Sequence, residues 1–184
     1  MEKHKLNLPA RSVSEVREDQ IVSLPDDLRT FLRRLKDEAR AVRALLESAQ
    51  PRHLDDVLRF AGRAWRRPIT NEESVRLRSF YEALRRDSQF DHPAAVRALL
   101  ARILVAPDFL YRIEKPSSES GVTALSDWEL ATRLSYFLWS SPPDAELRRA
   151  AAAGELRTPE ALIAQARRMM RDPRARRFAI EFFG

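Results

Sequence analysis

The chain has 184 residues, 44% of them hydrophobic, which is enough to bury a core in one domain or in two small ones. It contains no cysteine, which excludes disulfides, thiolate metal sites, a cysteine nucleophile and haem attachment through a C-x-x-C-H motif. The formal net charge is +6, and arginine outnumbers lysine by 29 to 4. Seven arginines against three carboxylates lie in residues 157–184, so the basic excess is a local feature rather than the broad footprint of a nucleic-acid-binding protein.

Residues 1–24 mix charged and isolated apolar side chains, and this pattern predicts a loosely ordered lead-in. They lack the apolar run of a signal peptide or a membrane-spanning helix, so we expect neither in this chain. From Pro25 onward, apolar residues recur at steps of three and four, which predicts an amphipathic helix that Pro51 ends or separates from the next helix. The stripe consists of Leu28, Phe31, Leu32, Leu35, Val42, Leu45 and Leu46.

We assign residues 1–50 to the lead-in and this first helix, and residues 51–114 to a first helical module of three helices. Thr70 and Glu73 fit a capping box, which predicts the start of its second helix. Asp91 is placed to cap the third, which should continue until a proline at position 107.

The polar, turn-rich stretch 115–123 predicts a linker between two domains. A second module is expected over 124–184. Ser126 and Glu129 form another capping box at its start, and Gly154 is placed to end a short helix. Further helix starts are predicted at Thr158-Pro159 and Asp172-Pro173. Because the sequence stops soon after an apolar helix begins, we expect the second module to be incomplete and the chain to be a fragment.

Four stretches carry a family resemblance. Residues 60–68 (FAGRAWRRP) and 103–112 (ILVAPDFLYR) resemble one helical module of the large planctomycete-type proteins that contain a cytochrome c domain. Residues 130–144 (LATRLSYFLWSSPPD) and 167–174 (RRMMRDPR) resemble the module that follows it in those proteins. The resemblance implies uncharacterised modules without an assigned activity, with c-type haem on another domain and no cofactor in this chain. It also implies an exported or periplasmic protein, although this chain shows no signal peptide, so the compartment stays open.

Aromatic and arginine side chains are the candidates for an interaction surface. The arginines could bind an acidic partner or a haem propionate, but we favour structural pairing with carboxylates such as Glu72 or Asp144, or capping of helix-end carbonyls. The aromatic residues Trp65, Trp128, Trp139, Tyr111 and Tyr136 could form a stacking surface, but core packing is favoured, with a surface corner as the alternative for Trp139. The candidate interaction residues are Arg66, Arg67, Arg133, Trp139, Arg167, Arg168, Phe182 and Phe183.

Catalysis by this chain is disfavoured. The carboxylates that could act as an acid–base pair are Asp127, Glu129, Asp144 and Glu146. All four stand at predicted helix starts, where free amides and the helix dipole already favour negative charge. The three histidines lack the spacing of a metal site, so no catalytic, cofactor or metal residue is expected.

The sequence therefore predicts an all-α protein of two consecutive small helical modules. We expect a non-catalytic structural or protein-interaction module of a multidomain, cytochrome-associated protein. Its partners would be the remaining domains of that family architecture or another protein. The alternatives are a basic helical nucleic-acid-binding protein and part of a carboxylate-dependent hydrolase.

Overall fold

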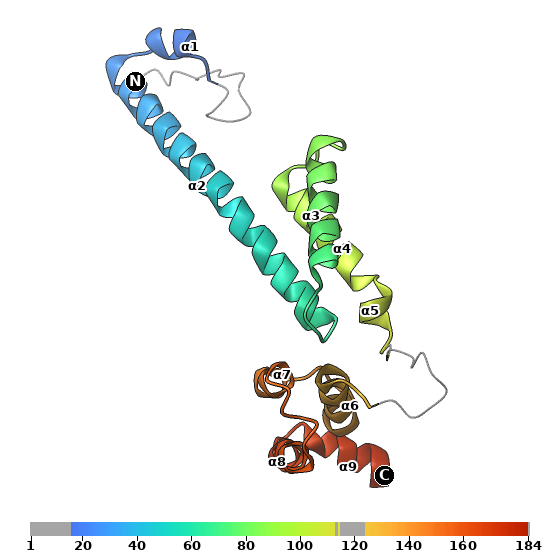
Figure 1. Cartoon of the computed structure of the whole chain (residues 1–184). Coiled ribbons are helices and arrows are strands. Elements are labelled where there is room, and N and C mark those ends of the chain that lie inside the picture. Colours follow the sequence, from blue (N-terminus) through green and yellow to red (C-terminus); the bar gives the residue numbers. More distant parts are fainter. Residues whose placement is uncertain (1–15, 113, 115–123, 184) are drawn as a thin grey trace. The chain divides into compact units, whose positions relative to one another are not determined.

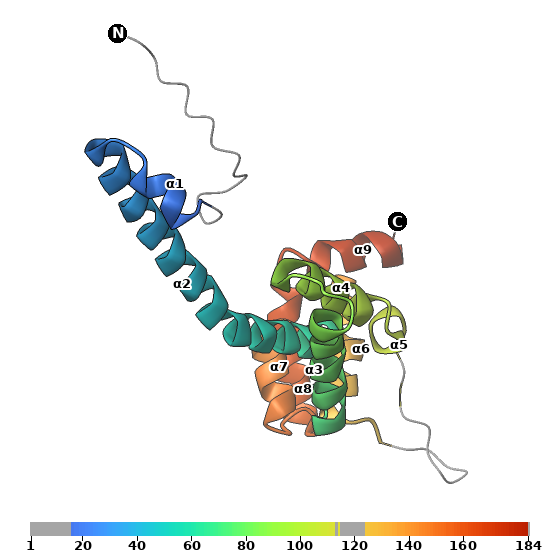
Figure 2. The same cartoon turned by 90° about the horizontal axis from the view of Figure 1, so that it is seen from above.

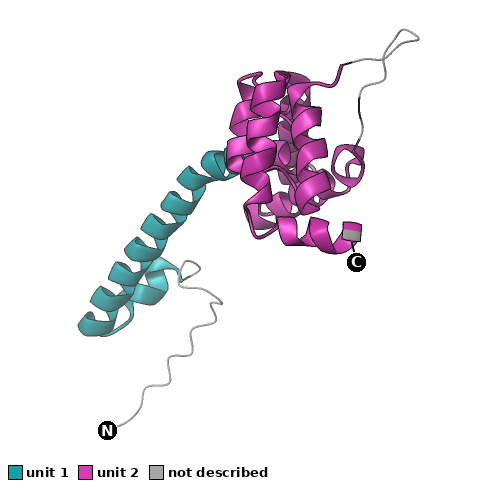
Figure 3. Ribbon diagram, turned by 90° about the horizontal axis from the view of Figure 1, so that it is seen from below, with its two compact units in different colours: residues 1–55 teal, residues 56–184 magenta. Residues whose placement is uncertain are grey.

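A computed structural model describes residues 16–112, 114 and 124–183 (Figure 1). Within these ranges all regular structure is helical, which confirms the all-α prediction. The chain divides into two compact units, residues 1–55 and 56–184 (Figure 3). In chain order the helices are α1 (Glu18–Val22), α2 (Asp26–Ala64), α3 (Asn71–Arg86), α4 (His92–Leu104), α5 (Pro107–Leu110), α6 (Asp127–Trp139), α7 (Ala145–Ala152), α8 (Pro159–Met170) and α9 (Ala175–Phe183).

Over the described residues, no helix combines the length and the apolar character that crossing a membrane requires.

In the first unit, a short helix packs near the start of α2, where the sequence predicted a loosely ordered lead-in. Ile21 of α1 is fully buried, and Val16 and Leu32 are nearly so. The Lys36 ammonium also donates to the carbonyl of Val16 at 2.8 Å. The prediction is wrong for residues 16–24, because two well-spaced apolar side chains suffice to hold a short segment on a helix. Residues 1–15 lie outside the described part.

The long helix α2 runs through Pro51, where the sequence predicted a break. A proline inside a helix removes one hydrogen bond and crowds the preceding turn, at a cost of about 3 kcal/mol. The turns that follow bury Leu54, Val57 and Leu58. Because each such side chain gains about 1.5–3 kcal/mol on burial, continuing the helix outweighs the cost of the proline.

The second unit begins with the end of α2, followed by α3, α4 and α5. Helices α3 and α4 lie side by side in Figures 1 and 2, and Leu99 and Ile103 of α4 are fully buried. The predicted capping box is confirmed: the Thr70 hydroxyl accepts from the Glu73 amide at 3.2 Å, and the Glu73 carboxylate accepts from the Thr70 amide at 2.8 Å. The predicted cap by Asp91 is confirmed as well.

The remainder of this unit is a cluster in which α6 contacts α7, α8 and α9 (Figure 1). Its core includes Leu147, Leu156 and Met169, all buried. The capping box at Ser126 and the left-handed Gly154 after α7 are confirmed. Thr158 does precede α8 but does not cap it, because its hydroxyl donates instead to the carbonyl of Glu155 at 2.9 Å. The predicted linker 115–123 lies outside the described residues.

Candidate functional site

The site begins at a sharp corner after α2, residues 65–70, which we call the Trp65 corner. The indole N–H of Trp65 donates to the carbonyl of Ile103 at 3.1 Å, which ties the corner to the end of α4. Arg66 then adopts a left-handed backbone with φ of 59°. The amide of Arg67 donates to the carbonyl of Gly62 at 3.2 Å, a pattern that closes a helix C-terminus.

Arg66 holds the short helix α5 against this corner. Its guanidinium donates to the carbonyls of Asp108 at 2.6 Å and Tyr111 at 2.8 Å, and more weakly to that of Phe109 at 3.3 Å. The side chain is buried, so these carbonyls replace the water that its charge loses. Arg66 therefore acts here as a cap of helix-end carbonyls, the structural role favoured from the sequence.

Arg67 links two helices through carboxylates. It donates to both oxygens of Glu73 at 2.9 and 2.8 Å and to Asp108 at 2.5 Å. These hydrogen bonds raise the pKa of Arg67, although burial opposes the rise, and hydrogen bonding from Arg67 lowers the pKa of Glu73 to about 2. The partner is thus Glu73 rather than the neighbouring Glu72 that the sequence suggested, since Glu73 also faces back toward the corner as part of the capping box.

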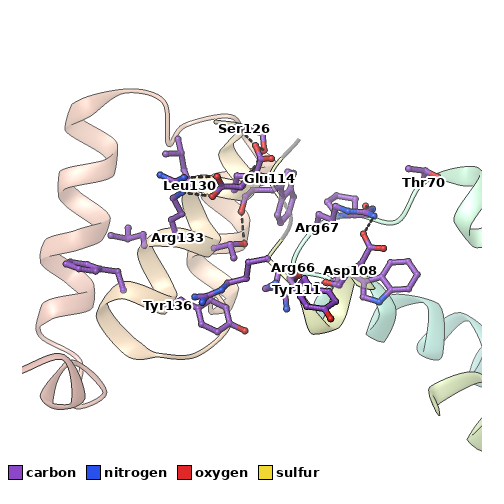
Figure 4. A pocket seen from close by; sticks show the side chains of 18 of the residues that line it. Arg66, Arg67, Thr70, Asp108, Tyr111, Glu114, Ser126, Leu130, Arg133 and Tyr136 are labelled. Carbon is purple, nitrogen blue, oxygen red and sulfur yellow. Dashed lines mark hydrogen bonds and ion pairs between the residues drawn. The ribbon is translucent and has the colours of Figure 1, made fainter. Parts of the chain in front are cut away.

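A second set of side chains faces the corner from α6. Arg133 donates to Glu114 at 2.5 and 2.6 Å, and this hydrogen bonding lowers the pKa of the carboxyl (Figure 4). The Tyr136 ring has two guanidinium groups near its face, that of Arg112 at 4.8 Å and that of Arg66 at 5.9 Å. Arginine over an aromatic face is a stabilising cation–π arrangement.

These groups line a pocket of about 1270 Å³ within the second unit (Figure 4). Five aromatic rings contribute to its wall, and its charged groups largely pair with one another, as in Arg67 with Glu73 and Arg133 with Glu114. Sites that bind partners or ligands combine apolar walls with a few fixed polar groups in this way. The lining aromatic residues are Trp65, Tyr111, Trp128, Tyr136 and Phe137.

One rim residue of the pocket, Phe137, also belongs to an exposed aromatic patch, which we define as Phe137, Phe178 and Phe182. The Phe137 ring lies 4.9 Å from Phe178 and 6.3 Å from Phe182, and the last two rings are 5.1 Å apart. Phe137 and Phe182 are 58% and 64% exposed. The side chain of Phe183 lies outside the described residues.

A second corner, residues 139–144, has a related geometry and is called the Trp139 corner. The Trp139 indole donates to the carbonyl of Met169 at 3.0 Å, and Ser140 is left-handed with φ of 50°. The Trp139 ring is 2% exposed, so the surface alternative is wrong for this residue. The guanidinium groups of Arg168 and Arg174 lie 5.7 and 3.6 Å from the ring centre.

Carboxylates hold both of these arginines. Arg168 donates to Asp144 at 2.7 and 3.1 Å, while Arg174 donates to Asp172 at 2.9 and 2.8 Å. Burial alone would raise the pKa of Asp144, but the hydrogen bonds from Arg168 and from a backbone amide lower it overall. Two of the C-terminal arginines, Arg168 and Arg174, therefore serve internal ion pairs, whereas Arg167 is exposed.

The four carboxylates considered for catalysis are engaged in helix starts and turns. Asp127 is buried and accepts from the Leu156 amide at 2.9 Å, and it pairs with Arg157 at 3.0 Å. Asp144 caps α7, and Glu129 closes its capping box. The described residues contain no group of three or more His, Asp or Glu side chains suited to a metal ion.

The structure thus brings Arg66, Arg67 and Arg133 to one pocket, and Trp139 with Arg168 to a separate corner. The sequence analysis named Asp144, the partner of Arg168, but not Glu73, Asp108 and Glu114, the partners of Arg67 and Arg133. The starts of predicted helices could have signalled Glu73 and Asp108, because a capping box and a Pro-Asp pair place carboxylates where arginines from a corner can reach.

Two family models match the chain. Residues 55–114 match PSD5, protein of unknown function (DUF1595), and residues 125–184 match PSD4, protein of unknown function (DUF1592). No curated protein and no solved structure matches the chain significantly. The two regions that build the pocket and the two tryptophan corners are therefore similar to two consecutive modules whose function is unknown.

Proposed function

We propose that the second unit is a non-catalytic interaction module of a multidomain, cytochrome-associated protein, and that its pocket rim and aromatic patch bind another protein domain. The observation that carries this proposal is the exposed aromatic patch beside a pocket whose charged side chains largely pair with one another. The partner would be another domain of the same family architecture, and a c-type cytochrome domain is the one that we propose.

The state of the carboxylates supports a binding role over a catalytic one. A general acid or base works best with a pKa near the working pH. The pKa of Glu73 is about 2, and that of Glu114 is also lowered by its arginine partner. At neutral pH both carboxylates are ionised acceptors that hold arginines in place, so they serve to shape the pocket.

The aromatic patch supports a protein as the partner. Exposed contiguous apolar surface marks interaction sites, and aromatic residues are enriched at the centres of protein interfaces. Phe137 joins the patch to the pocket, so a partner side chain that entered the pocket would also contact the patch. The arginines around the pocket add polar donors at its rim, as interfaces commonly require.

The cytochrome association rests on the sequence resemblance, and the matched modules are compatible with it. In this arrangement the haem is carried by the partner domain. This chain would contribute an apolar, arginine-bordered surface, and no residue of it is proposed to ligate iron.

Binding is tested by isothermal titration calorimetry of the full chain with a purified c-type cytochrome domain from a protein that carries both matched modules. We expect saturable binding that Phe137→Ser weakens by about tenfold or more, the loss typical of an aromatic anchor. Phe31→Ser is the matched control, because Phe31 is 59% exposed but lies in the first unit, and it should leave binding unchanged. Equal loss in both variants, or the absence of binding, would contradict the proposal.

A further inference from the structure

The middle of α2 is not covered by any other described residue of the first unit. All residues from 41 to 48 are exposed, so this stretch of two turns is covered on none of its faces by described residues. Three large apolar side chains are among them: Val42, Leu45 and Leu46 are 55%, 69% and 60% exposed. An isolated helix is only marginally stable in water and gains most of its stability by burying an apolar face, so this face is suited to a partner.

The apolar side chains follow a heptad repeat. Leu28, Leu35, Val42 and Ala49 are spaced by seven residues, and a second series with the same spacing lies four residues further on. A repeat of alternating three- and four-residue steps is the pattern by which two helices pair in a left-handed coiled coil. The first series occupies the d positions of the heptad. The second series occupies the a positions and consists of Leu32, Ala39 and Leu46.

The a and d positions together form an apolar stripe, which we call the seam, and only its later part is exposed. Leu32 is buried, and Lys36 reaches back to the carbonyl of Val16, so residues 16–36 already pack within the chain. From Ala39 to Ala49 the seam contains four positions, a length of about 15 Å at 1.5 Å per residue.

The charges beside the seam select both the partner and its direction. The flanking e positions hold Arg29, Lys36 and Arg43, which are all basic. An antiparallel pair of identical helices would place e beside e and so oppose positive charges. The g positions directly precede the a positions, and Glu38 is one of them. In a parallel pair, each g position lies beside the e position five residues further on in the other helix. Glu38 of each copy would therefore lie beside Arg43 of the other.

We propose that residues 39–49 of α2 form a short parallel coiled coil with the same segment of a second copy of this chain. The exposed apolar seam would be covered by its own copy, with the two-fold axis parallel to the helices. The pair Glu38 and Arg43 would occur twice, once on each side. Glu38 pairs in the isolated chain with Arg34 at 2.9 Å, and that pair lies on the surface, where exchanging one arginine for another costs little.

The absence of cysteine from the sequence makes the test direct. Three alanines serve as sites for single cysteines: Ala39 at an a position, Ala49 at a d position, and Ala44 on the outer face as the matched control. Identical a or d residues face each other in a parallel pair, within reach of a disulfide. After mild oxidation of the full-length chain we expect Ala39→Cys and Ala49→Cys to run at twice 21.3 kDa on a non-reducing gel, while Ala44→Cys stays monomeric.

The charge reversals check the direction independently. Arg43→Glu should weaken the dimer measured by sedimentation equilibrium, and Glu38→Arg combined with Arg43→Glu should restore it. Disulfide formation only in a mixture of Ala39→Cys with Ala49→Cys, or a dimer that Arg43→Glu alone leaves unchanged, would indicate an antiparallel pair and overturn the proposal. A monomeric mass at all concentrations, with no more cross-linking at Ala39 and Ala49 than at Ala44, would overturn it as well.

Discussion

The two tryptophan corners show how one packing arrangement can leave a site open or close it. In both corners an indole N–H donates to a carbonyl near the end of a later helix, Ile103 in one and Met169 in the other. A left-handed residue follows each tryptophan, and an arginine that carboxylates hold lies over each ring. In both corners, carboxylates thus hold the arginine that lies over the tryptophan ring.

They differ in the residue at the left-handed position. In the Trp65 corner it is Arg66, whose buried guanidinium reaches across to α5 and helps to form one wall of the pocket. In the Trp139 corner it is an exposed serine, and the arginines come instead from α8 and the turn before α9. The first corner therefore borders an open pocket, whereas the second completes a hydrophobic core.

The largest losses of stability are expected when either of the two corner tryptophans is replaced by alanine. Trp139→Ala should lower the free energy of unfolding by about 3–5 kcal/mol, because it opens a cavity in the core and leaves the Met169 carbonyl without its donor. Trp65→Ala should fall at the lower end of that range, since one side of its ring faces the pocket. Urea unfolding followed by circular dichroism measures both. The half-buried Trp128 is the control, and a loss as large for Trp128→Ala would contradict this ranking.

Replacing the two left-handed residues with glycine should change the free energy of unfolding in opposite directions. Arg66→Gly should lower the free energy of unfolding by about 2–4 kcal/mol, because the carbonyls of Asp108 and Tyr111 lose a charged donor. Ser140→Gly should raise the free energy of unfolding by about 0.5 kcal/mol. Glycine adopts a positive φ without strain, and this gain is only partly offset by the greater conformational entropy of glycine in the unfolded chain. Thermal unfolding of the two variants beside the wild type gives both signs. Stabilisation by Arg66→Gly would show that its guanidinium does not hold α5.

The carboxylates should make stability depend on pH in both corners. The pKa of Glu73 and that of Asp172 are each about 2, below the ordinary values of 4.5 and 3.8. A carboxyl whose pKa is lowered by folding stabilises the protein above its unfolded pKa, and this contribution is lost as the pH falls toward the folded pKa. Stability should therefore fall between about pH 4.5 and 2.

Glu73→Gln should reduce the loss of stability in the upper part of that pH range more than Asp172→Asn does. The reason is that the ordinary pKa of Glu73, 4.5, is higher than that of Asp172, 3.8. Urea midpoints measured at half-unit intervals between pH 5 and 2 would show this. Unchanged slopes in both variants would mean that other carboxylates dominate acid unfolding.

Local patterns in the sequence predicted the helices and most of their caps. Thr70 with Glu73, Asp91, and Ser126 with Glu129 all cap as expected, because a capping interaction spans only three residues. Continuity through Pro51 was not predicted, because it depends on the burial that the following turns obtain from distant parts of the chain.

The pocket was predicted only in part. Arg66, Arg67 and Arg133 were singled out, but Arg67 meets Asp108 across 41 positions, and Arg66 reaches Tyr111 across 45. Pairing over such separations is decided by how helices pack, so periodicity along one helix carries no information about it. The structural role favoured for these arginines agrees with their contacts to carbonyls and carboxylates.

The most direct test of the binding role uses the three tryptophans as separate probes. Each indole N–H gives its own signal in a ¹H–¹⁵N spectrum of the full chain. On addition of a c-type cytochrome domain, we expect the Trp128 and Trp65 signals, both from the pocket, to shift, while that of the core residue Trp139 stays in place. A shift confined to Trp139, or no shift of any indole at a saturating concentration, would contradict the account.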